Sequence, residues 1–139
     1  MPELRPRDAY PVCQTLPTRW RDNDQYGHVY NATYLELFDE AMTMTLAPQG
    51  FLAPDAPPLV VVENGCRYLS EVSWPAILRI GVAVTHLGRS SVRFDMGMFD
   101  GEAESPSATA HFVTVTIDRV TRRPVPIAEG RRAFLETLR

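Results

Sequence analysis

Two carboxylates, a histidine and an asparagine lie within ten residues of one another in the stretch from Arg19 to Asn31. They are Asp22, Asp24, His28 and Asn31, and an apolar segment with helical spacing follows them. A helix start carries free backbone N–H groups and a partial positive charge, so it can stabilise a developing anion. A carboxylate beside such a helix start supplies the least that hydrolysis of an acyl group needs, which is a base or nucleophile and an anion-stabilising site. We therefore predict that this stretch forms an active site.

The segment that must position this loop has helical spacing from Asn31 to about Leu46. Its polar residues form one narrow stripe at three-to-four spacing, which comprises Glu36, Asp39, Glu40 and Thr43. Apolar side chains cover the remaining surface, which predicts a helix that is nearly surrounded by protein. Asn31 is the expected N-cap, and Thr33 with Glu36 fits a capping box one turn later.

Five segments have the composition and alternation of strands: Val12–Trp20, Leu59–Val72, Ile77–Leu87, Ser91–Phe99 and Thr109–Asp118. Pro17 places the first strand at a sheet edge or a bulge, and Gly65 predicts a bulge in the second. Short connections favour an antiparallel sheet whose concave face holds the helix, and a short helix follows Pro126. We therefore predict one α+β domain over residues 1–139. One helix cannot cover both faces of this sheet and an edge stays open, so we expect self-association.

The composition is ordinary for a globular protein, with 45% hydrophobic and 22% charged residues. The net charge of -3 and the lack of any run of like charges give no reason to expect nucleic-acid binding. Cys13 and Cys66 have neither metal-binding nor redox spacing, so we expect reduced thiols. Asp22 and Asp24 would need a third ligand to hold a metal, and the sequence offers none nearby. No stretch is typical of a membrane span or an export signal, so we expect a cytoplasmic protein without a cofactor.

One motif carries a resemblance to a known family. It reads Trp20-x-Asp22-x-Asp24-x-x-Gly27-His28-Val29-x-Asn31-x-x-Tyr34, followed by Phe38-Asp39-Glu40-Ala41. Further matches are the turn Leu87-Gly88-Arg89-Ser90-Ser91 and the tail Asp118-Arg119-x-Thr121-x-Arg123-Pro124-Val125-Pro126. The chain resembles the hotdog-fold acyl-CoA thioesterases of the 4-hydroxybenzoyl-CoA thioesterase type from about Leu16 to Pro126.

The resemblance implies a hotdog fold, in which a five-stranded antiparallel sheet wraps around one long central helix. It also implies a dimer with joined sheets, often paired into a tetramer, and active sites at the dimer interface. Asp24 matches the family's catalytic carboxylate, whereas Tyr30 stands where many relatives have asparagine. The predicted catalytic set is Asp24, His28, Tyr30 and Asn31, with backbone N–H groups of residues 29–31 as oxyanion donors. The predicted substrate-binding set is Gly27, Tyr34, Arg67, Arg89, Ser90 and Ser91.

The predicted reaction is hydrolysis of an acyl-CoA to a free acid and CoA. A thiol has a pKa of about 8.5, so a thiolate leaves with little help from a general acid. One carboxylate and an oxyanion site are then enough, and the sequence holds no Ser-His-Asp arrangement with an elbow glycine motif. Asp24 would activate a water or attack the carbonyl to give a mixed anhydride. Asp22 is expected instead to brace the loop through hydrogen bonds with Arg19 or Arg21, and Glu63 and Asn64 are the backup candidates for the catalytic or water-holding role. Two alternatives stay open: a hotdog enoyl-CoA hydratase or dehydratase, and a non-catalytic acyl-CoA binding module.

Overall fold

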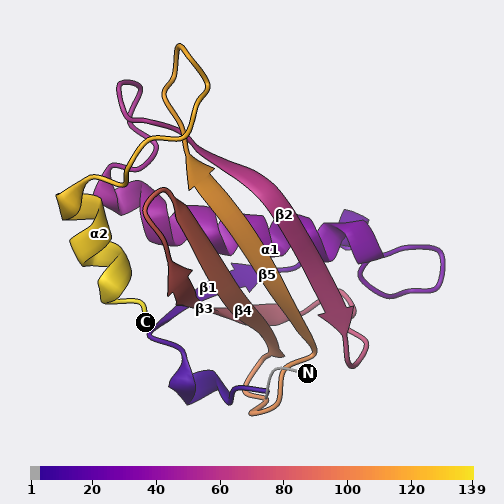
Figure 1. Ribbon diagram of the computed structural model, residues 1–139. Helices are drawn as coiled ribbons and strands as arrows, with labels where there is room; N and C mark the ends of the chain where they lie inside the picture. The colour runs from indigo at the N-terminus through magenta and orange to yellow at the C-terminus, as the bar shows by residue number, and fades with distance from the viewer. Residues whose placement is uncertain (1–3) are drawn as a thin grey trace.

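Residues 4–139 are described by a computed structural model, in which one long helix crosses a single five-stranded sheet (Figure 1). The strands are β1 (Val12–Pro17), β2 (Leu59–Tyr68), β3 (Ile77–Leu87), β4 (Ser91–Asp100) and β5 (Ala108–Thr116). The helices are α1 (Asn31–Leu46) and α2 (Glu129–Glu136), with 3-10 turns at Arg7–Ala9, Trp20–Asp22 and Ala47–Gln49. The sheet order is β1-β3-β4-β5-β2, and every neighbouring pair is antiparallel. This arrangement confirms the predicted α+β hotdog architecture.

The core lies between α1 and the inner face of the sheet. In β4 the alternation seen in the sequence is confirmed, because Val92, Phe94, Met96 and Met98 are all buried. From α1, Phe38 and Ala41 are fully buried against this face. The predicted polar stripe is exposed at Glu36, Asp39 and Glu40. The helix is therefore covered on one side only, and the prediction that protein nearly surrounds it is wrong for the part of the chain that the structure describes.

Several local predictions are corrected by the backbone. Tyr30 is the N-cap of α1 and makes no side-chain cap, so Asn31 is the first helical residue rather than the cap. The first strand ends at Pro17 because the chain turns into a 3-10 helix at Trp20. The second strand ends at Tyr68.

The bulge in β2 also lies elsewhere than predicted. The register shifts between Val61 and Glu63, so Val62 is the inserted residue, while Gly65 pairs regularly with His111. Glycine is needed at position 65 for space, since a Cβ there would lie 2.7 Å from Cε1 of His111.

The two edges of the sheet differ. β1 is six residues long and ends on a proline, which blunts an edge. β2 is ten residues long, and several apolar side chains on it or just beyond it are exposed: Val61, Val62, Tyr68 and Leu69. The open edge that the sequence predicted is therefore β2.

Candidate active site

The loop before α1 is a tight turn held by its own backbone. The N–H of Asp24 donates to the carbonyl of His28 at 2.7 Å, and the N–H of Gly27 donates back to the carbonyl of Asp24 at 3.1 Å. Gly27 has a φ of 81°, in the left-handed region that favours glycine, and it is the turn residue of the loop. Val29 is buried at 4% exposure and anchors the end of the loop in the core. The loop is thus fixed at both ends, and its side chains have defined directions.

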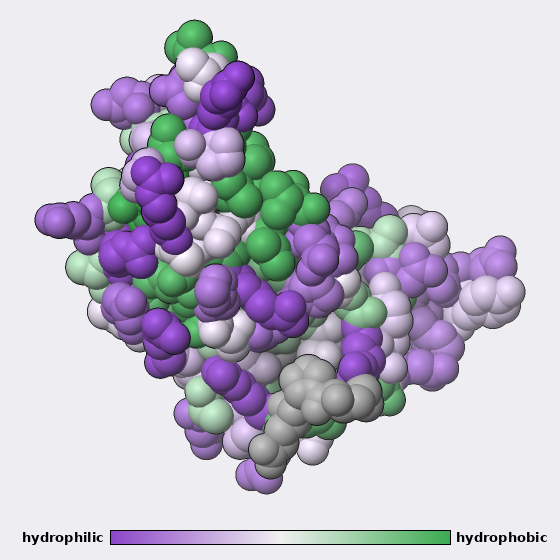
Figure 2. Space-filling model, in the orientation of Figure 1, coloured by the Kyte–Doolittle hydropathy of each residue, from purple (hydrophilic) through white to green (hydrophobic). Residues whose placement is uncertain are grey.

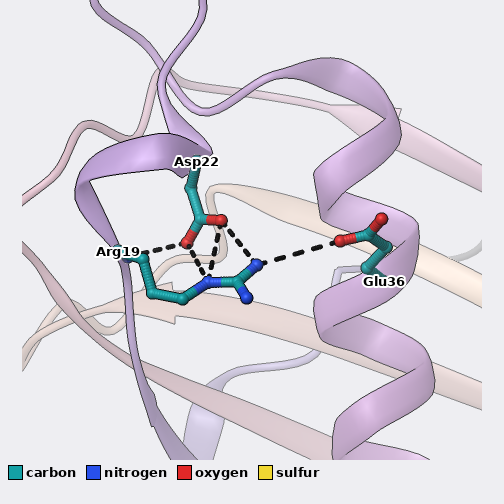
Figure 3. A network of polar contacts seen from close by, with 3 residues as sticks. All are labelled: Arg19, Asp22 and Glu36. Atoms are coloured by element: carbon teal, nitrogen blue, oxygen red, sulfur yellow. Dashed lines mark hydrogen bonds and ion pairs between the residues drawn. The ribbon is translucent and has the colours of Figure 1, made fainter.

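Asp22 points into the protein and is used by the fold. It is 1% exposed, and its carboxylate accepts hydrogen bonds from the backbone N–H of Arg19 at 2.7 Å and from the Arg19 guanidinium at 2.7 and 3.1 Å. Figure 3 shows this fork and the further contact of Arg19 with Glu36 on α1 at 3.9 Å. Burial alone would raise the pKa of Asp22, but the hydrogen bonds from Arg19 outweigh it and hold that pKa below its usual range. This agrees with the bracing role that we inferred from the sequence.

Asp24 has a different environment, because it is only half-buried and lines a cleft. Its Oδ1 accepts the N–H of Tyr26 at 2.8 Å and, more weakly, that of His28 at 3.4 Å. Within residues 4–139 its Oδ2 has no hydrogen-bond partner. One oxygen therefore fixes the carboxylate, and the other remains open for chemistry.

The cleft has a volume of about 320 Å³ and lies between the loop, the start of α1 and the segment after β2. It is lined by Asp24, His28, Val29, Asn31, Tyr34, Tyr68, Leu69, Ser70 and Glu71. The segment after β2 is fastened to the loop by hydrogen bonds from Val29 N–H to the carbonyl of Val72 at 2.7 Å and from Trp74 N–H to the side chain of Asn23 at 3.0 Å. The cleft walls are thus joined by hydrogen bonds to the backbone and to one side chain.

The start of α1 supplies open donors on this cleft. The N–H groups of Val29 and Tyr30 are occupied, by the carbonyls of Val72 and Asp22, so the prediction that they serve an oxyanion is wrong. The first-turn N–H groups of Asn31 and Ala32 have no acceptor in the described part of the chain, as expected for a helix N-terminus. Any anion site here therefore begins at Asn31.

A pair of tyrosines forms the inner wall. The rings of Tyr34 and Tyr68 meet edge to face at 5.0 Å, and the Tyr68 hydroxyl donates to the carbonyl of Asn31 at 2.9 Å. Burial raises the pKa of Tyr34, so its hydroxyl stays neutral. Across the cleft, Nε2 of His28 lies 3.0 Å from a carboxylate oxygen of Glu71.

Comparison with known proteins decides the family. The sequence profile of the thioesterase-like superfamily matches residues 18–135. The chain belongs to this superfamily. The match confirms the resemblance drawn from the sequence, and the protein is an enzyme of the thioesterase class.

Solved structures agree with this assignment. The chain is 34% identical to the PA5185 protein from Pseudomonas aeruginosa, with 99% of this chain and 97% of that one covered and a TM-score of 0.92. It is 27% identical to a thioesterase from Thermus thermophilus solved with coenzyme A and Zn, with 94% and 96% covered and a TM-score of 0.78. A 1,4-dihydroxy-2-naphthoyl-CoA thioesterase from Synechocystis, at 17% identity, shares the fold over 88% and 93% of the chains with a TM-score of 0.79. No curated protein sequence matches at a significant level.

In this thioesterase-like chain, only some of the predicted site residues meet in the cleft. Asp24, His28, Asn31 and Tyr34 line it, and Gly27 turns the loop beside it. Tyr30 is 49% exposed and is not among the lining residues. Tyr68, Ser70 and Glu71 were missed, because the sequence ran the second strand on to Val72 and gave no sign that the chain turns back at Tyr68. The backup candidate Glu63 pairs with His111, 2.9 Å away, rather than with the cleft.

The predicted arginine and serine contacts lie elsewhere in the protomer. Arg89, Ser90 and Ser91 form the β3–β4 turn, whose backbone contacts Thr116 and Ile127. That turn lies at the Leu59 end of β2, whereas the cleft lies at the Tyr68 end, about 30 Å away along ten residues of strand. Arg67 faces outward, away from the side of β2 that carries Tyr68.

Between residues 4 and 139 no helix is both long and apolar enough to cross a membrane. In the same range no three histidine, cysteine, aspartate or glutamate side chains gather closely enough to hold a metal ion.

Proposed function

We propose that this protein hydrolyses the thioester of an acyl-CoA to a free acid and CoA in the cleft at the start of α1. The observation that carries the proposal is the meeting of Asp24, which has one free carboxylate oxygen, with the open first-turn N–H groups of Asn31 and Ala32. A base or nucleophile and an anion site are the two elements that acyl transfer from a thiol requires.

Two routes fit this geometry. In the first, Oδ2 of Asp24 takes a proton from a water, the oxygen adds to the thioester carbonyl, and the N–H groups of α1 hold the oxyanion until the C–S bond breaks and the CoA thiolate leaves. In the second, Oδ2 itself adds to the carbonyl, the thiolate leaves from a mixed anhydride, and water then hydrolyses the anhydride. Single turnover in ¹⁸O-labelled water distinguishes the routes, since attack of water on the Asp24 carbon of the anhydride would leave label in Asp24.

His28 is held beside Asp24 by Glu71. Glu71 engages one ring nitrogen, which fixes the orientation of the imidazole and leaves the other nitrogen for substrate. We assign His28 to contact with the substrate beside Asp24, and Glu71 to positioning of His28.

A dimer would bring the predicted substrate-binding residues of the β3–β4 turn, which include Arg89, close to a cleft. Pairing of β2 with the β2 strand of a second copy about a two-fold axis would be antiparallel, because such an interface is isologous. It would cover the exposed Val61, Val62 and Leu69, and would bring the partner's β3–β4 turn to the end of the sheet where the cleft lies. Arg89 of each chain would then serve the CoA phosphates of the other chain's site.

A hydrolysis screen over short, long, branched and aryl acyl-CoAs, with detection of the free thiol, tests the activity. Thiol release that depends on Asp24 supports the proposal. Binding without release would indicate a binding module, and addition of water to an enoyl-CoA without thiol release would indicate a hydratase.

Light scattering tests the dimer, because a stable, active monomer at micromolar concentration would contradict a shared site. Arg89→Ala should raise KM for acyl-CoA more than it lowers kcat, since a phosphate clamp acts equally on the ground and transition states. An equal effect on acyl-pantetheine, which lacks the nucleotide, would show that Arg89 does not reach the nucleotide end.

A further inference from the structure

A second and larger cavity, of about 870 Å³, lies on the outer face of the sheet, away from α1. Small residues of the sheet lie in register beside this cavity. Gly81, Gly97 and Thr109 face one another across β3, β4 and β5. One step along, Gly65 of β2 pairs with His111 of β5. The rings of Tyr10 and His111 lie over these glycines, and the cavity lies beside the two rings. We call this cavity the outer hollow.

One wall of the outer hollow is built by Tyr10, from the segment before β1. Its ring lies directly on two of the glycines: a Cβ at Gly81 would overlap the ring, and a Cβ at Gly97 would lie 2.6 Å from the Tyr10 hydroxyl oxygen. Tyr10 also meets Phe99 edge to face at 5.9 Å. Burial raises the pKa of Tyr10 to about 12, so the hydroxyl stays protonated and adds no charge at neutral pH. The wall is therefore packed and neutral.

The charged groups around the outer hollow do not balance. Arg5, Arg67 and Arg93 line it, against a single lining carboxylate, Asp95. Asp95 is already engaged, by Arg93 at 3.2 Å and by the hydroxyl of Thr85. Neither Arg5 nor Arg67 has a carboxylate partner within residues 4–139, and Arg5 instead lies over the Tyr10 ring at 5.7 Å.

The nearby carboxylate of Glu63 does not balance these guanidinium groups either, because it pairs with a histidine. His111 lies across Gly65, and its Nε2 is engaged by Glu63 at 2.9 Å, so that carboxylate is also used. Figure 2, which looks onto this face, shows hydrophobic residues gathered over one part of the sheet and hydrophilic ones beside them. The outer hollow is a concave site whose described lining holds more guanidinium groups than carboxylates.

We propose that the outer hollow binds a small anionic molecule through a phosphate or diphosphate group held by Arg67 and Arg93, with Arg5 at the rim. Arg93 contacts Asp95 through Nε and Nη2, which leaves its Nη1 without a partner within residues 4–139. Guanidinium groups bind phosphate oxygens with two parallel hydrogen bonds, and the size of the hollow falls within the range of small-molecule sites. This site is separate from the proposed active site, because Arg67 and Tyr68 are neighbours in β2 and point to opposite faces of the sheet.

Calorimetric titration of the whole protein with inorganic pyrophosphate tests the proposal. Wild-type protein should bind, and both Arg67→Gln and Arg93→Gln should weaken binding by about tenfold or more, as for loss of a hydrogen bond to a charged group. Arg79→Gln is the matched control: Arg79 also faces outward, from β3, but it is paired with Glu102 and does not line the hollow. Its affinity should equal that of wild type.

Two further variants separate the outer hollow from the cleft and from a loss of fold. Thr109→Leu fills the hollow without changing charge and should prevent binding, with the melting temperature measured on the same sample. Asp24→Asn should bind pyrophosphate as wild type does. The proposal is overturned if wild type does not bind, if Thr109→Leu or Arg67→Gln binds normally, or if Asp24→Asn abolishes binding. It is also overturned if Arg67→Gln changes only the oligomeric mass, since the hollow would then be an interface between copies.

Discussion

The two halves of the loop before α1 use the same residue type in opposite ways. Asp22, in the first half, is 1% exposed and its carboxylate is saturated by Arg19. Asp24, in the second half, keeps one carboxylate oxygen free beside the first turn of a helix. Asp22 is therefore a structural carboxylate, and Asp24, two residues later, is the one that we propose as the base or nucleophile. The role of an aspartate in this loop is therefore set by its backbone and arginine partners, and substitution of each aspartate tests this.

Asp24→Asn should give the largest effect. The amide is nearly isosteric and can still accept the N–H of Tyr26, so folding and acyl-CoA binding should persist. Neither a base nor a nucleophile remains, and loss of a positioned general base costs about 10²–10⁴-fold in kcat. The measurement is kcat on one good acyl-CoA, with the melting temperature of the same preparation. Near wild-type turnover would show that the wrong carboxylate has been assigned to the chemistry.

Asp22→Asn should lower the stability of the protein much more than its turnover. It removes a buried acceptor of charged hydrogen bonds from Arg19, which costs about 1–3 kcal/mol of unfolding free energy. Because the residue points away from the cleft, kcat at a temperature where the protein is folded should fall much less than in Asp24→Asn. Urea denaturation and kcat on the same samples give both numbers. An Asp22→Asn variant that is inactive but as stable as wild type would show that the two aspartates do not have separate roles.

The sequence located the loop but not all of the contacts that it makes, and the reasons are physical. Residue types and spacing located the loop, Gly27 and the helix, because these depend on local backbone preferences and apolar periodicity. The free donors could not be predicted, since Val29 and Tyr30 use their N–H groups on Val72 and Asp22, and the first of these is a long-range contact. The long-range partners Tyr68 and Glu71 were missed for the same reason. Arg67 was misplaced because a strand's pleat, rather than its composition, decides which face a side chain takes.

The pH dependence of stability should test the structural role of the ionised Asp22. The pKa of Asp22 is lowered in the folded protein, so its contribution is complete above the unfolded value of about 3.9 and is lost as the pH falls through the lower folded value. The difference in unfolding free energy between wild type and Asp22→Asn should therefore be largest at neutral pH and shrink in strong acid. Denaturation curves at both pH values measure it. A difference that stays constant or grows on acidification would contradict the proposed role of the ionised carboxylate.

The smallest effects should come from substitution of Glu71 and Glu36, each of which contacts one half of the loop. Glu71 contacts His28 beside Asp24, whereas Glu36 contacts Arg19 beside Asp22, so the two form a matched pair. Both are mostly exposed, and exposed ion pairs contribute at most about 1 kcal/mol to stability. If Glu71 positions a substrate-contacting imidazole, Glu71→Ala should lower kcat/KM several-fold without changing the melting temperature. Glu71→Gln, which still accepts a hydrogen bond, should restore much of the loss, and Glu36→Gln should leave kcat/KM at the wild-type value. Equal effects of Glu71→Gln and Glu71→Ala would remove the positioning role, and a kinetic effect of Glu36→Gln would show that the two halves of the loop are not separate.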